Sequence, residues 1–95
     1  MSTRSENKGR KLDITQDVLK FLRDLQAKQC KQVTLTILAL GQDATPHDSA
    51  VLSYHPCHRV DIGEYRVIYR FDAETVYVAH VGKRNDDEVY RWLKR

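Results

Sequence analysis

Apolar residues recur at helical spacing in the first third of the chain. Between residues 18 and 25 they stand at i, i+3, i+4 and i+7, which predicts an amphipathic helix. Thr15 is a suitable N-cap for this helix, because its hydroxyl can accept a hydrogen bond from a free backbone amide. Lys11–Ile14 precedes the cap and is expected to form a short edge strand. The apolar stripe consists of Val18, Phe21, Leu22 and Leu25.

The next segment fits two different periods. Its apolar residues have helical spacing, yet the run from Val33 to Ile37 alternates and is rich in β-branched residues, which is typical of a strand. The preceding run AKQCKQ favours helix by its composition. We therefore expect a helix from about Lys28 to Leu40, which forms a helical hairpin with the first, and a strand over 33–37 is the alternative.

The second half of the chain is rich in β-forming residues and predicts three strands, at 57–62, 65–71 and 75–81. Gly63-Glu64 joins the first two as a two-residue loop with glycine first, which fits a type II′ hairpin. In that register Asp61 lies opposite Arg66, and Ile62 lies opposite Tyr65. A two-residue loop at Ala73-Glu74 would place the third strand antiparallel to the second.

Alternation along these strands separates an apolar face from a basic face. The two-residue loop at 73–74 adds Val76 and Val78 to the apolar face, whereas a three-residue loop would move them to the basic face. The apolar face carries Val60, Ile62, Val67 and Phe71. The basic face carries Arg59, Asp61, Arg66, Ile68 and Arg70.

After Val81, Gly82 is expected to turn the chain, so that Lys83 and Arg84 project from the strand end. Apolar residues at 89, 92 and 93 predict a short C-terminal helix. The expected fold class is α+β, with an N-terminal helical hairpin packed on a small, mainly antiparallel sheet and a short C-terminal helix. Residues 1–10 lack periodicity and predict a flexible tail, which leaves 11–95 as a single domain.

Composition indicates the cellular compartment of the protein and the charge of its partner. With 95 residues, 41% of them hydrophobic and 31% charged, the chain resembles an ordinary globular domain. It has no apolar run of membrane-spanning length and no secretory signal, so we expect a cytoplasmic protein that does not contact a membrane. The net charge of +3 favours an anionic partner. Cys30 and Cys57 are expected to be free thiols in that compartment.

The basic face has two interpretations. Arginines bind phosphates well, because the guanidinium fork donates several hydrogen bonds and stays charged. The plainer interpretation is a solvated outer face, on which Asp61 forms a cross-strand ion pair with Arg66. Lys83 and Arg84 favour an oxyanion site, to which Arg70 can add a phosphate contact, and Tyr90 can stack on a base.

Other chemistry finds little support in the sequence. His47, His55, Cys57 and His58 cluster along the chain, but they do not show the paired spacing of a zinc site. There is no glycine-rich phosphate loop and no nucleophile elbow. We therefore expect that any catalysis uses cations and phenols, without a metal or a small-molecule cofactor.

Two runs, RVDIGEYRVIY and VYVAHVGKRNDDEVY, closely resemble the RelE-type toxins of bacterial and archaeal toxin–antitoxin modules, and the likeness extends over residues 11–95. The resemblance implies a metal-independent endoribonuclease that cuts messenger RNA in the ribosomal A site. In this reaction the 2′-hydroxyl of the substrate attacks the adjacent phosphate. The implied partners are the messenger RNA, the ribosome and an inhibitory cognate antitoxin.

The resemblance also implies roles for single residues. Arg59 and Arg66 match the cations that bind the scissile phosphate, Arg84 the arginine that protonates the leaving group, and Tyr90 the tyrosine that stacks on the substrate. Asp61 stands where well-studied members have a lysine suited to act as general base. Either Asp61 accepts the proton itself, or it holds Arg66 and the base lies elsewhere.

Two other functions remain open. One is a non-enzymatic toxin of the same fold, like the ParE-type gyrase poisons, which generally lack the pairing of Arg84 with Tyr90. The other is a basic RNA-binding module without activity, which would bind RNA in a salt-dependent way and leave it intact.

Overall fold

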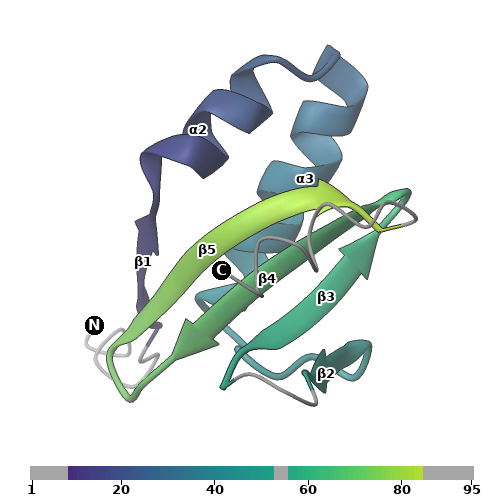
Figure 1. Cartoon of the computed structure of the whole chain (residues 1–95). Coiled ribbons are helices and arrows are strands. Elements are labelled where there is room, and N and C mark those ends of the chain that lie inside the picture. The colour runs from purple at the N-terminus through teal and green to yellow at the C-terminus, as the bar shows by residue number, and fades with distance from the viewer. Residues whose placement is uncertain (1–8, 53–55, 85–95) are drawn as a thin grey trace, which may run out of the picture.

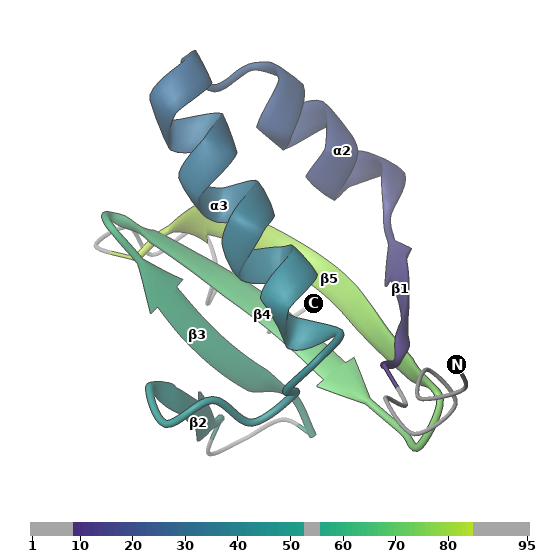
Figure 2. The same cartoon turned by 180° about the vertical axis from the view of Figure 1, so that it is seen from behind.

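A computed structural model describes residues 9–52 and 56–84 of the chain. Within them, two helices cover one face of a five-stranded sheet with the strand order β1-β5-β4-β3-β2 (Figures 1 and 2). This confirms the α+β fold class, with a mixed sheet in which only β1 and β5 are parallel. The predicted C-terminal helix lies outside the described residues. The elements are β1 (Lys11–Ile14), α2 (Gln16–Arg23), α3 (Ala27–Leu40), β2 (Ser49–Val51), β3 (His58–Ile62), β4 (Tyr65–Phe71) and β5 (Thr75–Lys83).

The helical hairpin forms as predicted. Thr15 caps α2, and its Oγ1 accepts a hydrogen bond from the Val18 amide at 3.2 Å. The ambiguous segment is the helix α3, which buries its stripe of Val33, Ile37 and Leu40 against the sheet. A strand over 33–37 would have turned Leu35 to the same side as Val33, whereas in the helix Leu35 is 54% exposed. No helix of the described part is long and apolar enough to cross a membrane.

The hairpin between β3 and β4 has the predicted register. Asp61 pairs with Arg66, and Ile62 pairs with Tyr65. Gly63 has a φ of 60°, the left-handed region that glycine adopts without strain, and no other described residue has a positive φ. A positive φ at the first loop position alone is the type II′ pattern. The loop therefore fixes which side chains of β3 and β4 share a face.

The second hairpin also has the predicted two-residue loop at Ala73-Glu74. The Asp72 amide donates to the Thr75 carbonyl at 3.0 Å, and Phe71 pairs with Val76. Val76 and Val78 therefore lie on the apolar face, together with the fully buried Tyr69. The parallel strand β1 extends this face, since Leu12 pairs with Val76 at the edge of the sheet.

The end of β5 differs from the prediction. The strand continues to Lys83, and Gly82 lies inside it opposite Arg66 instead of turning the chain. The register shifts beside it, since Ile68 pairs with His80 but Tyr69 pairs with Val78, so that β5 has an extra residue, Ala79. Strict alternation from Val78 would have placed Val81 on the basic face. This β-bulge returns Val81 to the core, where it is 3% exposed.

The main core lies between the helices and the sheet. It contains Val33, Ile37, Val67, Tyr69, Val76 and Val78, each no more than 1% exposed. The hydroxyl of Tyr69 donates to the Ala44 carbonyl at 2.6 Å, which satisfies its polar group in this buried setting.

A smaller cluster of Ile68, Cys57 and Leu52 lies on the other face. Ile68 therefore lies on the predicted basic face but is fully buried there. Neither Cys30 nor Cys57 forms a disulfide with another described residue.

Candidate functional site

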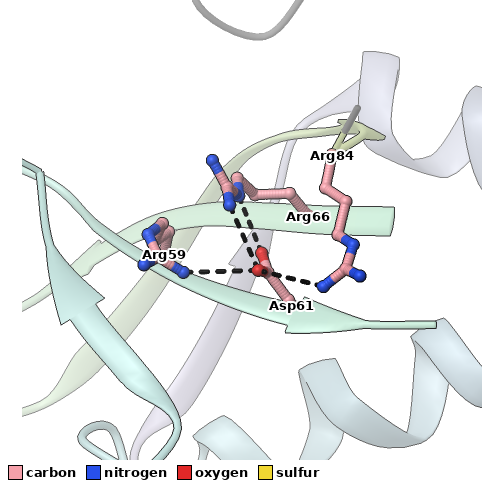
Figure 3. A network of polar contacts seen from close by, with 4 residues as sticks. All are labelled: Arg59, Asp61, Arg66 and Arg84. Atoms are coloured by element: carbon pink, nitrogen blue, oxygen red, sulfur yellow. Dashed lines mark hydrogen bonds and ion pairs between the residues drawn. The ribbon is translucent and has the colours of Figure 1, made fainter. Parts of the chain in front are cut away.

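Four charged side chains gather on the face of the sheet opposite the helices, which we call the arginine face (Figure 3). Arg59 and Asp61 alternate along β3, so both point to this face, and the register places Arg66 of β4 directly opposite Asp61. Arg84 follows β5, and its backbone amide donates to the Glu64 carbonyl at 2.9 Å. That bond holds Arg84 beside the hairpin turn. The sheet therefore brings together four of the residues predicted from the sequence.

Asp61 is the centre of the cluster. The Nε and Nη2 atoms of Arg66 lie 2.7 and 3.1 Å from its two carboxylate oxygens, which is a forked contact. Nη1 of Arg59 lies 3.3 Å from Oδ2, and Nη1 of Arg84 lies 3.7 Å from the same oxygen. Three guanidinium groups around one carboxylate leave a net charge of +2. The arrangement therefore retains the capacity to attract a further anion.

Exposure rises outward through the cluster. The Arg66 side chain is 13% exposed, Asp61 21%, Arg59 32% and Arg84 47%. The inner pair is thus fixed by its surroundings, while Arg59 and Arg84 offer donor groups to solvent. A phosphate would meet these two side chains first.

The environment keeps Asp61 ionised. The hydrogen bond from Arg66 lowers the pKa of Asp61, partial burial opposes that shift, and the positive charges of Arg66, Arg59 and Arg84 lower the pKa further. A carboxylate with a lowered pKa is a weak base. The geometry therefore favours Asp61 as the group that holds the arginines.

The other predicted site residues do not join this cluster. Lys83 pairs with Tyr65, whose ring lies in the main core, so the register assigns Lys83 to the helix-covered face. Arg70 is on the arginine face but four residues further along β4 than Arg66, and its guanidinium stacks on the ring of Tyr77. Tyr90 lies outside the described residues. Tyr77 was not a sequence-based candidate, although the predicted loop at 73–74 already placed it opposite Arg70.

Two of the described histidines, His58 and His80, are part of the packing, and His55 lies outside the described residues. His58 stacks on Phe71 at a centroid distance of 5.0 Å, and burial lowers its pKa, as expected for a partly buried histidine. His80 lies opposite Ile68 on the arginine face and is partly buried, while His47 is exposed in the loop before β2. The described residues contain no group of three or more His, Cys, Asp or Glu that could hold a metal ion.

Solved structures of toxins have the same fold. The chain is similar to the toxin–antitoxin complex RelBE2 from Mycobacterium tuberculosis, at 20% identity over 82% of this chain and 94% of that chain (TM-score 0.69). It is also similar to a mutant of E. coli RelE in the free state, at 23% identity over 87% and 92% (TM-score 0.71). A third is the archaeal RelE–RelB complex from Pyrococcus horikoshii, at 20% identity over 80% and 96% (TM-score 0.69). These likenesses show that the chain shares the fold of these RelE structures.

The family follows from the sequence profile. Residues 12–88 match the family described as the ParE toxin of the type II toxin–antitoxin system parDE, which spans most of the chain. The chain belongs to this toxin family. A comparison with curated protein sequences found no match.

Proposed function

We propose that this toxin is a metal-independent endoribonuclease that cleaves messenger RNA in the ribosomal A site. The observation that supports it is the convergence of Arg59, Arg66 and Arg84 on one carboxylate, because such a cluster can bind the anionic centre of a phosphodiester. The match of the two C-terminal runs to RelE-type toxins supports the same function. The ribosome would hold the RNA in the geometry required for reaction.

In the proposed reaction the RNA supplies its own nucleophile. The 2′-oxygen attacks the adjacent phosphorus and loses its proton, the bond from phosphorus to the 5′-oxygen breaks, and that oxygen gains a proton. The products are a 2′,3′-cyclic phosphate and a 5′-hydroxyl. Negative charge increases on the phosphorane oxygens, where preorganised guanidinium groups stabilise it. Arg84, the most exposed member of the cluster, is the candidate beside the leaving oxygen.

Asp61 has a positioning role in this mechanism. Its carboxylate aligns Arg66 and draws Arg59 and Arg84 towards one point, so the phosphate meets an assembled site. Its lowered pKa argues against proton abstraction at this group. Tyr90 is proposed to stack on the substrate, whereas Lys83 is left out of the proposed site because its register places it on the other face of the sheet.

The test is to induce the protein in a translating extract and to map the ends of messenger RNA. Arg84→Ala should reduce codon-phased cleavage by about 100- to 1,000-fold, the usual loss when one donor to a transition-state oxyanion is removed. Arg23→Ala is the matched control, because Arg23 is an exposed arginine in the last turn of α2. Equal cleavage by Arg84→Ala and Arg23→Ala would contradict the assignment.

A second candidate function is poisoning of DNA gyrase without catalysis. The observation in its favour is that the matching family is described as the ParE toxin. Growth arrest with intact messenger RNA, together with trapped gyrase–DNA complexes, would replace the nuclease by this function.

We also propose a cognate antitoxin as the inhibitory partner. Membership of a two-component family supports it, and two of the similar structures are complexes of a toxin with its antitoxin. Co-expression of the neighbouring reading frame should restore growth and yield a copurifying complex. Unchanged toxicity would exclude that reading frame as the partner.

A further inference from the structure

Arg70 and Tyr77 form a second feature on the arginine face, separate from the cluster around Asp61. They lie directly opposite each other on β4 and β5. The guanidinium carbon of Arg70 is 4.2 Å from the centroid of the Tyr77 ring, so cation and ring attract each other. Arg70 is exposed and Tyr77 is partly buried. The stacked guanidinium therefore forms the outer layer of the pair.

The turn between β4 and β5 holds this pair in place. The Tyr77 hydroxyl donates to Oδ2 of Asp72 at 3.3 Å, while Oδ1 of Asp72 accepts from the backbone amides of Glu74 and Thr75 at 2.8 and 2.9 Å. The ring is thus tied to the backbone of the turn. These contacts lower the pKa of Asp72, led by the bond from Glu74, so the acceptor is ionised at neutral pH.

The donor groups of Arg70 distinguish it from Arg66. Arg66 forms a forked contact with Asp61, whereas Arg70 has no hydrogen bond or ion pair with any residue in 9–52 or 56–84. An arginine whose plane is held by a ring and whose N–H groups remain available can stack on a base and bind a phosphate or base edge at the same time. Packing alone does not require this combination.

We propose that Arg70, supported by Tyr77, binds an unpaired nucleobase of RNA beside the bound phosphodiester. This inference rests on the proposed ribonuclease function, to which it adds a subsite. Arg70 lies four residues along β4 from Arg66, a separation of about 13 Å in an extended strand. The bound base therefore belongs to a nucleotide that flanks the reacting phosphate, and the subsite requires single-stranded RNA.

The experiment measures binding of short single-stranded RNAs to the full-length protein by fluorescence anisotropy. The RNAs contain two or five nucleotides with 2′-O-methyl groups, so the 2′-oxygen cannot attack. Arg70→Ala and Arg70→Lys should each weaken binding of the five-nucleotide RNA by about tenfold, the effect of losing one stacked base. Binding of the two-nucleotide RNA should be unchanged. Arg23→Ala is the control for removal of one exposed positive charge.

The lysine variant separates stacking from charge. Wild-type affinity in Arg70→Lys would overturn the subsite, because it would show that charge alone matters, and so would an equal loss for both RNA lengths. Unaltered binding of the longer RNA by Arg70→Ala would overturn it as well. Circular dichroism melting shows whether each variant is folded. Binding of RNA that depends on Arg70 without cleavage in the translating extract would refute the proposed function and support the subsite.

Discussion

The two faces of the sheet differ in the charged side chains that they carry. On the helix-covered face, the buried residues of the described chain are apolar or aromatic, and Tyr69 meets its one polar requirement through a neutral hydrogen bond to Ala44. On the arginine face, three arginines contact the carboxylate of Asp61, and all four side chains remain partly exposed. The strand β4 serves both faces, since Arg66 and Val67 are neighbours in sequence. We therefore expect stability to depend mainly on the helix-covered face, and binding chemistry on the arginine face.

The largest expected effect tests the helix-covered face. Ile37→Ala should lower the free energy of unfolding by about 2–5 kcal/mol, because it removes a side chain that is 1% exposed and leaves a cavity. Leu35→Ala on the same helix is the matched control, and its 54% exposure predicts a change within about 0.5 kcal/mol. Urea unfolding measures both. Similar losses for the two variants would contradict the described packing of α3.

The second expected effect tests how much the inner pair, Asp61 and Arg66, contributes to the free energy of unfolding. Arg66→Ala should lower the free energy of unfolding by about 1–3 kcal/mol, since it leaves the carboxylate of Asp61 without its forked partner. Asp61→Asn combined with Arg66→Ala should cost less than the two single losses added together, because the charges interact. Additive losses in this double-mutant cycle would show that the pair contributes little.

The sequence predicted the fold because its local patterns agreed with each other. The loops Gly63-Glu64 and Ala73-Glu74 determined the register of three strands, and that register placed Asp61 opposite Arg66 and Val76 in the core. The extra residue Ala79 was missed, because a β-bulge breaks the alternation on which strand faces are predicted. The turn expected at Gly82 was also wrong, because Gly82 continues β5 opposite Arg66.

The candidate site was predicted less completely than the fold. Sequence alternation brought Arg59, Asp61 and Arg66 to one face, but it could not show that Arg84 reaches the same carboxylate, since this depends on the end of β5 and on its bond to Glu64. The same limit explains why the position of Lys83 was not predicted. It was grouped with Arg84 as its neighbour, whereas the bulge sets it opposite Tyr65 on the other face.

A third, smaller expected effect is a change of stability with pH that comes from His58. Burial lowers the pKa of His58, so unfolded chains bind protons more readily than folded ones as the pH falls below about 6.5. Stability should therefore decrease from pH 7.5 to pH 5.5, and His58→Phe should reduce that decrease in urea unfolding. His47→Gln is the control, because His47 is exposed. An unchanged pH dependence in His58→Phe would contradict the assignment.

The arginine face should respond only in more acidic solution. The hydrogen bond from Arg66 lowers the pKa of Asp61, so its contribution is fully present above the unfolded value of about 3.9 and is lost as the pH falls through the folded value. Asp61→Asn should therefore leave the slope between pH 7.5 and pH 5.5 unchanged and flatten the loss of stability below pH 4. A changed slope near neutral pH would show that the two faces are coupled.

The smallest effect distinguishes the outer arginines from the inner one. Arg59 meets Asp61 at 3.3 Å with a single nitrogen and is 32% exposed, so Arg59→Ala should change the free energy of unfolding by less than about 1 kcal/mol. The change should shrink further in high salt, which screens exposed pairs. Under the proposed function, the same variant should strongly reduce RNA cleavage, because Arg59 is one of the cations that bind the phosphate. A loss of stability as large as that of Arg66→Ala would instead make Arg59 part of the structural support and remove the distinction between the two positions.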